Sequence, residues 1–189
     1  EDTDPHLDRD LGAWFSESCD LPRLTLLGPV RARTRGLALT KRKPYYTELL
    51  AYLSTRPYGA TPDELADAFS LTPARARNDV KIVRDWLGTN PRTGRKHLPD
   101  AREAPAAIAR GVGVYQVEDV LTDTDLFKRL RLRGEARGAD GMPDLRRALT
   151  LVEGRPFDRL RPGGWSWLLE GDRLDHHLLC AVVDVAHLV

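Results

Sequence analysis

The sequence has few cysteines and no long apolar run. Cys19 and Cys180 lie far apart and form no CxxC pair, so neither a disulfide framework nor a zinc site built on cysteine pairs is expected. No stretch approaches the roughly 20 apolar residues that a membrane-spanning helix needs. The first residues are acidic, which argues against a secretory signal peptide. We therefore expect a cytoplasmic protein, linked to a membrane only through segments outside this sequence.

The motifs of common enzyme classes are also missing. The sequence contains no nucleophile elbow, Walker loop or HExxH motif. Gly111-Val112-Gly113 lacks the third glycine and the following helix of a dinucleotide-binding loop. His176, His177 and Cys180 have metal-ligating chemistry, but a helix face beside a tryptophan-rich core explains them at least as well. We expect no enzymatic activity, no cofactor, no metal and no small-molecule substrate.

Charge is distributed unevenly along the chain. The composition, with 41% hydrophobic and 30% charged residues, is that of a folded globular protein. Residues 1–22 carry seven acidic residues and one arginine, whereas residues 23–117 carry seventeen basic and eight acidic residues. Residues 118–189 are again slightly acidic. A basic block between acidic ones is typical of a protein with a polyanionic partner, although a solvated basic face gives the same pattern.

Three parts are expected along the chain. Residues 1–21 lack sustained periodicity and are rich in acid, which predicts a linker or a poorly ordered arm. Residues 22–118 begin with short apolar or alternating segments separated by turns, which predict a small antiparallel meander at 23–27, 30–34 and 37–39. Residues 119–189 have helical periodicity and few strand signals, which predicts antiparallel helix pairs of a solenoid type, cut short at the C-terminus. The expected fold class is α+β.

Helix signals are clear in the middle of the chain. Apolar residues recur at helical spacing from Pro44 until Arg56-Pro57 breaks the run. Thr61-Pro62 and Thr72-Pro73 each combine an N-cap with a proline at the first helical position. The second of these helices, 73–87, is basic and ends at Gly88. A helix, a tight connection and a basic helix predict a helix-turn-helix unit.

A wing is expected after this unit. Residues 89–107 are rich in proline, glycine and charge, so they are interpreted as a loop. Residues 108–117 then read as two short strands around a glycine-rich turn. A hairpin that follows a recognition helix is the wing of a winged-helix domain.

The helix at 73–87 has a core face and a basic remainder. Ala76, Val80, Val83 and Leu87 share one face, which should be buried. Side chains able to reach base edges or phosphates lie around it: Arg75, Arg77, Asn78, Lys81 and Arg84. Further phosphate contacts are expected from flanking residues: Lys41, Arg42, Lys43, Arg95 and Lys96. Two acids on the helix oppose DNA binding unless they form i,i+4 pairs, Asp79 with Arg75 and Asp85 with Lys81.

Several segments of the first domain carry a family resemblance. The sequences LTLLGPV (24–30), VRDWLG (83–88) and GVGVYQV (111–117) resemble the opening strand, the recognition helix and the wing strand of the Streptomyces antibiotic regulatory protein (AfsR-like) family. The resemblance implies an OmpR-like winged helix at 22–118. It also implies a cytoplasmic transcriptional regulator that binds direct repeats of double-stranded DNA and contacts RNA polymerase.

The second domain carries the same resemblance. The sequences DLF (125–127) and RRALTLVEGRPF (146–157), with Trp165 and Trp167, resemble the bacterial transcriptional activator domain, which is tetratricopeptide-like. The sequences WLGTNPRTG (86–94), HLPDA (97–101) and LVEGRPF (151–157) resemble a subgroup at the C-terminus of larger actinobacterial proteins. Expected partners are duplex DNA, RNA polymerase and a second copy of the chain. The alternative is a protein-interaction module in which the winged helix has lost its affinity for DNA.

Overall fold

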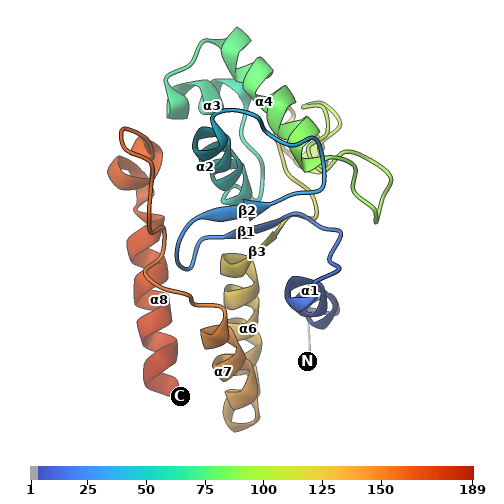
Figure 1. The fold of residues 1–189 in the computed structure, drawn as a ribbon. Coiled ribbons are helices and arrows are strands. Elements are labelled where there is room, and N and C mark those ends of the chain that lie inside the picture. The colour runs from blue at the N-terminus through green and yellow to red at the C-terminus, as the bar shows by residue number, and fades with distance from the viewer. Residues whose placement is uncertain (1–3) are drawn as a thin grey trace.

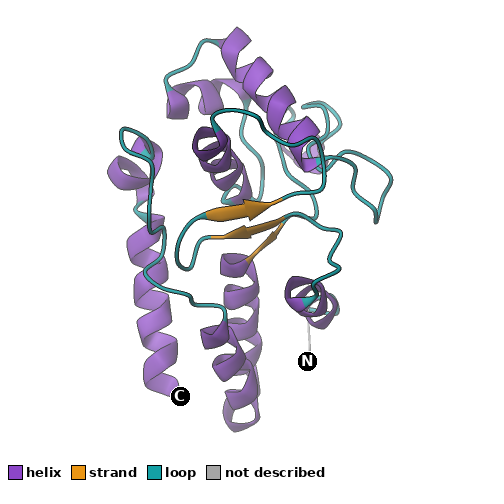
Figure 2. Ribbon diagram, in the orientation of Figure 1, coloured by secondary structure: helices purple, strands orange, loops and turns teal. Residues whose placement is uncertain are grey.

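A small sheet separates two groups of helices (Figures 1 and 2). The computed structural model describes residues 4–189. The strands are β1 (Arg23–Thr25), β2 (Arg31–Arg33) and β3 (Leu121–Thr122). The α-helices are α1 (Leu7–Phe15), α2 (Lys43–Ser54), α3 (Pro62–Phe69), α4 (Pro73–Leu87), α5 (Pro105–Arg110), α6 (Asp123–Arg137), α7 (Met142–Thr150) and α8 (Leu174–Leu188). A 3₁₀ turn (Gly138–Gly141) joins α6 to α7, and a kinked helical segment (Trp167–Asp172) precedes α8. The expected α+β class is confirmed.

The sheet is mixed rather than antiparallel throughout. Its order is β2-β1-β3, with β1 antiparallel to β2 and parallel to β3. The strand expected at 37–39 is wrong. The backbone N–H groups of Gly36 and Leu37 instead donate to the carbonyls of Trp86 and Asp85, at 3.1 and 2.8 Å. This segment therefore satisfies the carbonyl end of α4, which would otherwise lack partners.

The helix-turn-helix segment forms as its capping residues predict. The Thr61 hydroxyl accepts the Glu64 N–H at 3.1 Å and the Glu64 carboxylate accepts the Thr61 N–H at 2.8 Å, which is a complete capping box. The Thr72 hydroxyl caps α4 by accepting the N–H of Arg75. Gly88 ends α4 with a positive φ of 78°. The expected bounds of this helix, 73–87, are confirmed.

The wing expected at 108–117 is wrong as a two-stranded hairpin. Residues 108–110 are the last turn of α5, which begins at Pro105 and ends where Gly111 adopts a left-handed conformation. Tyr115 pairs with Ala60 in an isolated antiparallel bridge, with N···O distances of 2.7 and 2.9 Å. Proline and glycine here delimit a short helix, whereas the prediction assigned the same glycines to a strand turn.

The acidic N-terminal segment also differs from expectation. The residues expected to form a linker or poorly ordered arm contain α1, whose Leu7 and Leu11 are fully buried. Two arginines of α6 hold it in place. Arg129 contacts Asp4 and Asp10 at 2.6 and 3.0 Å, and Arg133 contacts Asp8 at 3.1 Å. The acidic side chains of this segment thus pair with a basic helix. Residues 1–3 lie outside the described residues.

Residues from both expected domains share one hydrophobic cluster. Buried Glu48 of α2 accepts the Trp165 N–H and the Arg161 Nε–H, each at 2.7 Å. Buried Asp123, at the start of α6, accepts the N–H groups of Leu26 and Leu27 at 2.8 Å. These bonds cross the boundary expected at 118/119. No helix within residues 4–189 has the length and apolar character needed to cross a bilayer.

Candidate nucleic-acid interface

The buried side of α4 is built around an acid. Ala76, Val80 and Val83 lie in the core, as predicted. Asp79 is fully buried beside them, and its carboxylate accepts the Tyr45 hydroxyl at 2.7 Å and the Arg75 Nε–H at 3.1 Å. Burial, reinforced by Asp79, raises the pKa of the Tyr45 hydroxyl well above its usual value. The spacing predicts this Arg75–Asp79 ion pair, and its formation engages Arg75, one of the five α4 side chains expected to bind DNA.

The exposed side of α4 carries side chains without internal partners. Arg77, Asn78 and Lys81 are exposed, and within residues 4–189 they make no side-chain hydrogen bond or ion pair. At 100° per residue, the three project from adjoining parts of the helix surface, with Asn78 and Lys81 on the side away from the core and Arg77 at its flank. These three are the α4 residues of the predicted set that remain available for an external ligand.

Arg84 has a different environment. Only 19% of its side chain is exposed, its Nε–H donates to the Leu98 carbonyl at 2.6 Å, and an Nη–H donates to the Pro99 carbonyl at 3.2 Å. Asp100 lies 3.4 Å from the same guanidinium. Arg84 therefore fastens the loop after α4 to the helix. The expected Lys81–Asp85 pair does not form among the described residues, which leaves the charge of Lys81 uncompensated.

The basic residues before α2 lie at the surface. Lys41 and Lys43 are exposed and have no ion-pair partner in the described part of the chain. The guanidinium of Arg42 lies 4.2 Å from the ring centroid of Tyr45, in a cation–π contact. Because Tyr45 also binds Asp79 of α4, this contact places the Lys41–Lys43 segment beside the helix-turn-helix unit. These residues thus lie at the surface next to α4, and their contact with phosphate stays a prediction.

The loop after α4 contributes fewer available cations than its sequence suggests. Lys96 is exposed, and an Nη–H of Arg95 donates to the Glu103 carbonyl at 3.1 Å. Arg92 is engaged with Asp119 and Asp10, at 2.9 and 3.0 Å. His97 is buried with its Nδ1 2.8 Å from the Glu118 carbonyl oxygen, and burial lowers its pKa. Arg92 and His97 therefore stabilise the loop.

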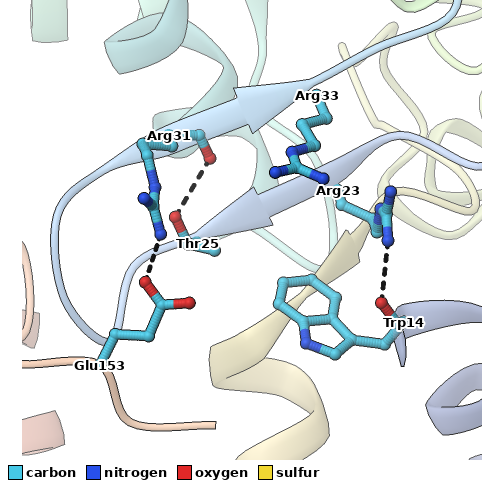
Figure 3. A pocket seen from close by; sticks show the side chains of 6 residues that line it. All are labelled: Trp14, Arg23, Thr25, Arg31, Arg33 and Glu153. Carbon is cyan, nitrogen blue, oxygen red and sulfur yellow. Dashed lines mark hydrogen bonds and ion pairs between the residues drawn. The ribbon is translucent and has the colours of Figure 1, made fainter. Parts of the chain in front are cut away.

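The sequence analysis did not predict a second basic surface, which lies on the sheet. Arg23, Arg31 and Arg33 project from one face of β1 and β2, because alternate residues of a strand share a face (Figure 3). The period-two pattern of RAR at 31–33 was read only as a strand signal. The arginines of this pattern could have been grouped only by knowing that β1 pairs with β2 in this register.

Comparisons with known proteins add no family assignment. No protein-family model matches the chain, and no curated protein matches it significantly. Among the described residues, no group of three or more His, Cys, Asp or Glu side chains is arranged to hold a metal ion. The case for a function therefore rests on the geometry of α4 and on the resemblance in its sequence motifs.

Proposed function

We propose that the chain is a DNA-binding transcriptional regulator whose helix α4 enters the major groove. The single observation that carries this proposal is the exposed trio Arg77, Asn78 and Lys81, which has no partner within residues 4–189. Guanidinium and ammonium groups recognise guanine edges and phosphates, and an amide recognises adenine. A capped helix of 15 residues that follows a short helix and a tight turn is an appropriate support for such side chains.

The proposed arrangement is a variant of the winged helix. In place of a two-stranded wing, α5 and the segment through Tyr115 follow the loop after α4. The exposed segment Lys41–Lys43 and Lys96 would contact phosphates on either side of the groove. Because Arg75 and Arg84 are engaged internally, the affinity should depend on fewer cations than the sequence contains.

The test is a fluorescence-anisotropy titration with mixed genomic duplex fragments at low and at physiological salt. We expect binding that weakens steeply with salt, because released counterions drive association with DNA. The double variant Arg77→Glu/Lys81→Glu should abolish it without unfolding the protein, since neither side chain makes a hydrogen bond or ion pair within residues 4–189. Arg84 is left unchanged because its substitution would also disturb the 98–100 loop.

A matched control reverses the same amount of charge elsewhere. Lys128 of α6 and Arg146 of α7 are exposed and have no ion-pair partner within the described residues. Lys128→Glu/Arg146→Glu should therefore bind almost as the wild type does. Equal loss in both double variants would show a nonspecific effect of net charge. Absence of binding by the wild type, even at low salt, would refute the proposal and favour a protein-interaction module.

A further inference from the structure

A hollow of about 170 Å³ lies on the arginine-bearing face of the sheet (Figure 3). Arg23, Arg31 and Arg33 line it together with Thr25, and the Trp14 indole of α1 and Glu153 stand at its border. Three guanidinium groups thus face a single carboxylate. Among the described residues that line it, the hollow therefore has an excess of positive charge.

The pairing of β1 and β2 makes this charge unusual. Arg23 and Arg33 stand directly opposite each other across the strands. Like charges in directly opposed positions destabilise a sheet unless an anion lies between them. Neither arginine has an ion-pair partner within residues 4–189, whereas Arg31 is paired with Glu153 at the border. An anion placed between Arg23 and Arg33 would reduce the repulsion between these two guanidinium groups.

Arg23 is held in place but is not satisfied. Its Nη1 donates to the carbonyls of Trp14 and Ser16, at 2.9 and 3.0 Å, which fixes the orientation of the guanidinium. Its Nε is buried and has no hydrogen-bond partner. A buried N–H donor without an acceptor is uncommon in native proteins. The carbonyl contacts orient the group without compensating its charge, so the guanidinium still attracts an anion.

The surroundings favour a small phosphorylated molecule. Guanidinium groups recognise phosphate oxygens through paired N–H donors. The Trp14 indole adds an apolar wall that suits the body of an organic ligand. In Figure 1, α1 lies on the side of the sheet away from α4, so the hollow is walled by a segment outside the proposed DNA surface.

We propose that this hollow binds a small phosphorylated molecule, with Arg23 and Arg33 holding its phosphate and Arg31 exchanging Glu153 for the ligand. The site does not depend on the proposed DNA contacts of α4. A bound phosphate would bridge β1 and β2 and would border α1 through Trp14. Occupancy should therefore stabilise the folded protein as well as neutralise the sheet face.

Pyrophosphate is the probe for the test, with binding measured by calorimetry and by tryptophan fluorescence. Trp14 is partly exposed and lines this hollow, whereas Trp86, Trp165 and Trp167 are buried, so the part of a fluorescence change that depends on Trp14 reports on this hollow. We expect saturable binding, a raised melting temperature and a fluorescence change that Trp14→Phe removes. Arg33→Gln should weaken binding by about tenfold or more, the loss expected for a charged hydrogen-bonding partner.

Arg146→Gln is the matched control, because it removes one exposed arginine on α7 and should leave pyrophosphate binding unchanged. Arg33 is also exposed, so Arg33→Gln should fold normally, which a thermal melt checks. Undetectable pyrophosphate binding by the wild type at millimolar concentration would overturn the proposal. Equal binding by Arg33→Gln would do so too. If Arg33→Gln weakened only duplex DNA binding, the face would belong to the DNA surface instead.

Discussion

Arginines at the two ends of the molecule have opposite environments. At the α1–α6 interface, Arg129 contacts three aspartates and Arg133 contacts two, so these charges are neutralised within the fold. On the outer face of α4, Arg77 and Lys81 have no such partner in the described part of the chain. The positions of the carboxylates therefore decide which arginines are neutralised within the fold and which stay available to an external ligand. The acidic residues of the N-terminal segment pair with α6, whereas Arg77 and Lys81 of α4 form no ion pair among the described residues.

The largest effect on stability is expected at the paired end. The side chains of Arg133 and Asp144 are each only 10% exposed, and they lie 2.7 Å apart. The pKa of Arg133 is raised, chiefly by its hydrogen bond to Asp144. Arg133→Ala should lower the free energy of unfolding by about 3 kcal/mol, because it leaves a largely buried carboxylate without its main partner. Urea denaturation measures this loss.

Arg146→Ala should change that free energy by less than about 0.5 kcal/mol, as expected for an exposed side chain that forms no ion pair within residues 4–189. Similar unfolding curves for Arg133→Ala and the wild type would mean that the ion pairs at α6 contribute little. This result would contradict the claim that the arginines of α6 stabilise the fold.

A smaller effect on stability is expected within α4, which carries both an internally bonded arginine and an exposed one. Arg84→Ala should lower the free energy of unfolding by about 1–2 kcal/mol, since the carbonyls of Leu98 and Pro99 lose their donors. Arg77→Ala should leave stability unchanged and weaken DNA binding. Thermal melts and anisotropy titrations of both variants separate the two roles. Loss of stability in Arg77→Ala would show that this side chain is not free.

The smallest effect concerns pH and His97. Burial lowers the pKa of this imidazole below its ordinary value of 6.5, so the folded state favours the neutral form. The stability that His97 contributes is therefore present above pH 6.5 and is lost as the pH falls from there toward the lowered pKa. His97→Asn, which can still donate to the Glu118 carbonyl but does not titrate, should lose less stability over that range. Chemical denaturation between pH 7.5 and 5 compares them, and parallel curves would contradict the prediction.

Local signals predicted the helices of the central segment well. Thr61 and Thr72 act through hydrogen bonds only three residues away, so sequence proximity suffices to place α3 and α4. The core face of α4 follows from periodicity alone. The Arg75–Asp79 pair was predictable for the same reason, because one helical turn separates the two residues.

Features that depend on contacts between residues distant in sequence were not predicted correctly. Arg84 looked available because its partners are carbonyls 14 and 15 residues away in a loop without regular structure. The N-terminal segment looked like an arm because its partners, Arg129 and Arg133, lie more than a hundred residues away. Strand β3 has two residues, Leu121 and Thr122, too few for an alternating pattern. At 108–117, the glycines are compatible with either a hairpin turn or the end of a helix. The helix forms because Pro105 occupies its first position and Gly111 ends it.

The most direct test of the contrast is the salt dependence of DNA binding. Each phosphate contact that is lost should reduce the slope of log K against log[salt] by about 0.9. Arg77→Gln/Lys81→Gln should therefore bind duplex DNA more weakly, with a slope that is reduced by the loss of one to two phosphate contacts. Lys128→Gln/Arg146→Gln should keep the wild-type slope. Identical slopes for all three proteins would contradict the claim that the uncompensated cations of α4 contact DNA.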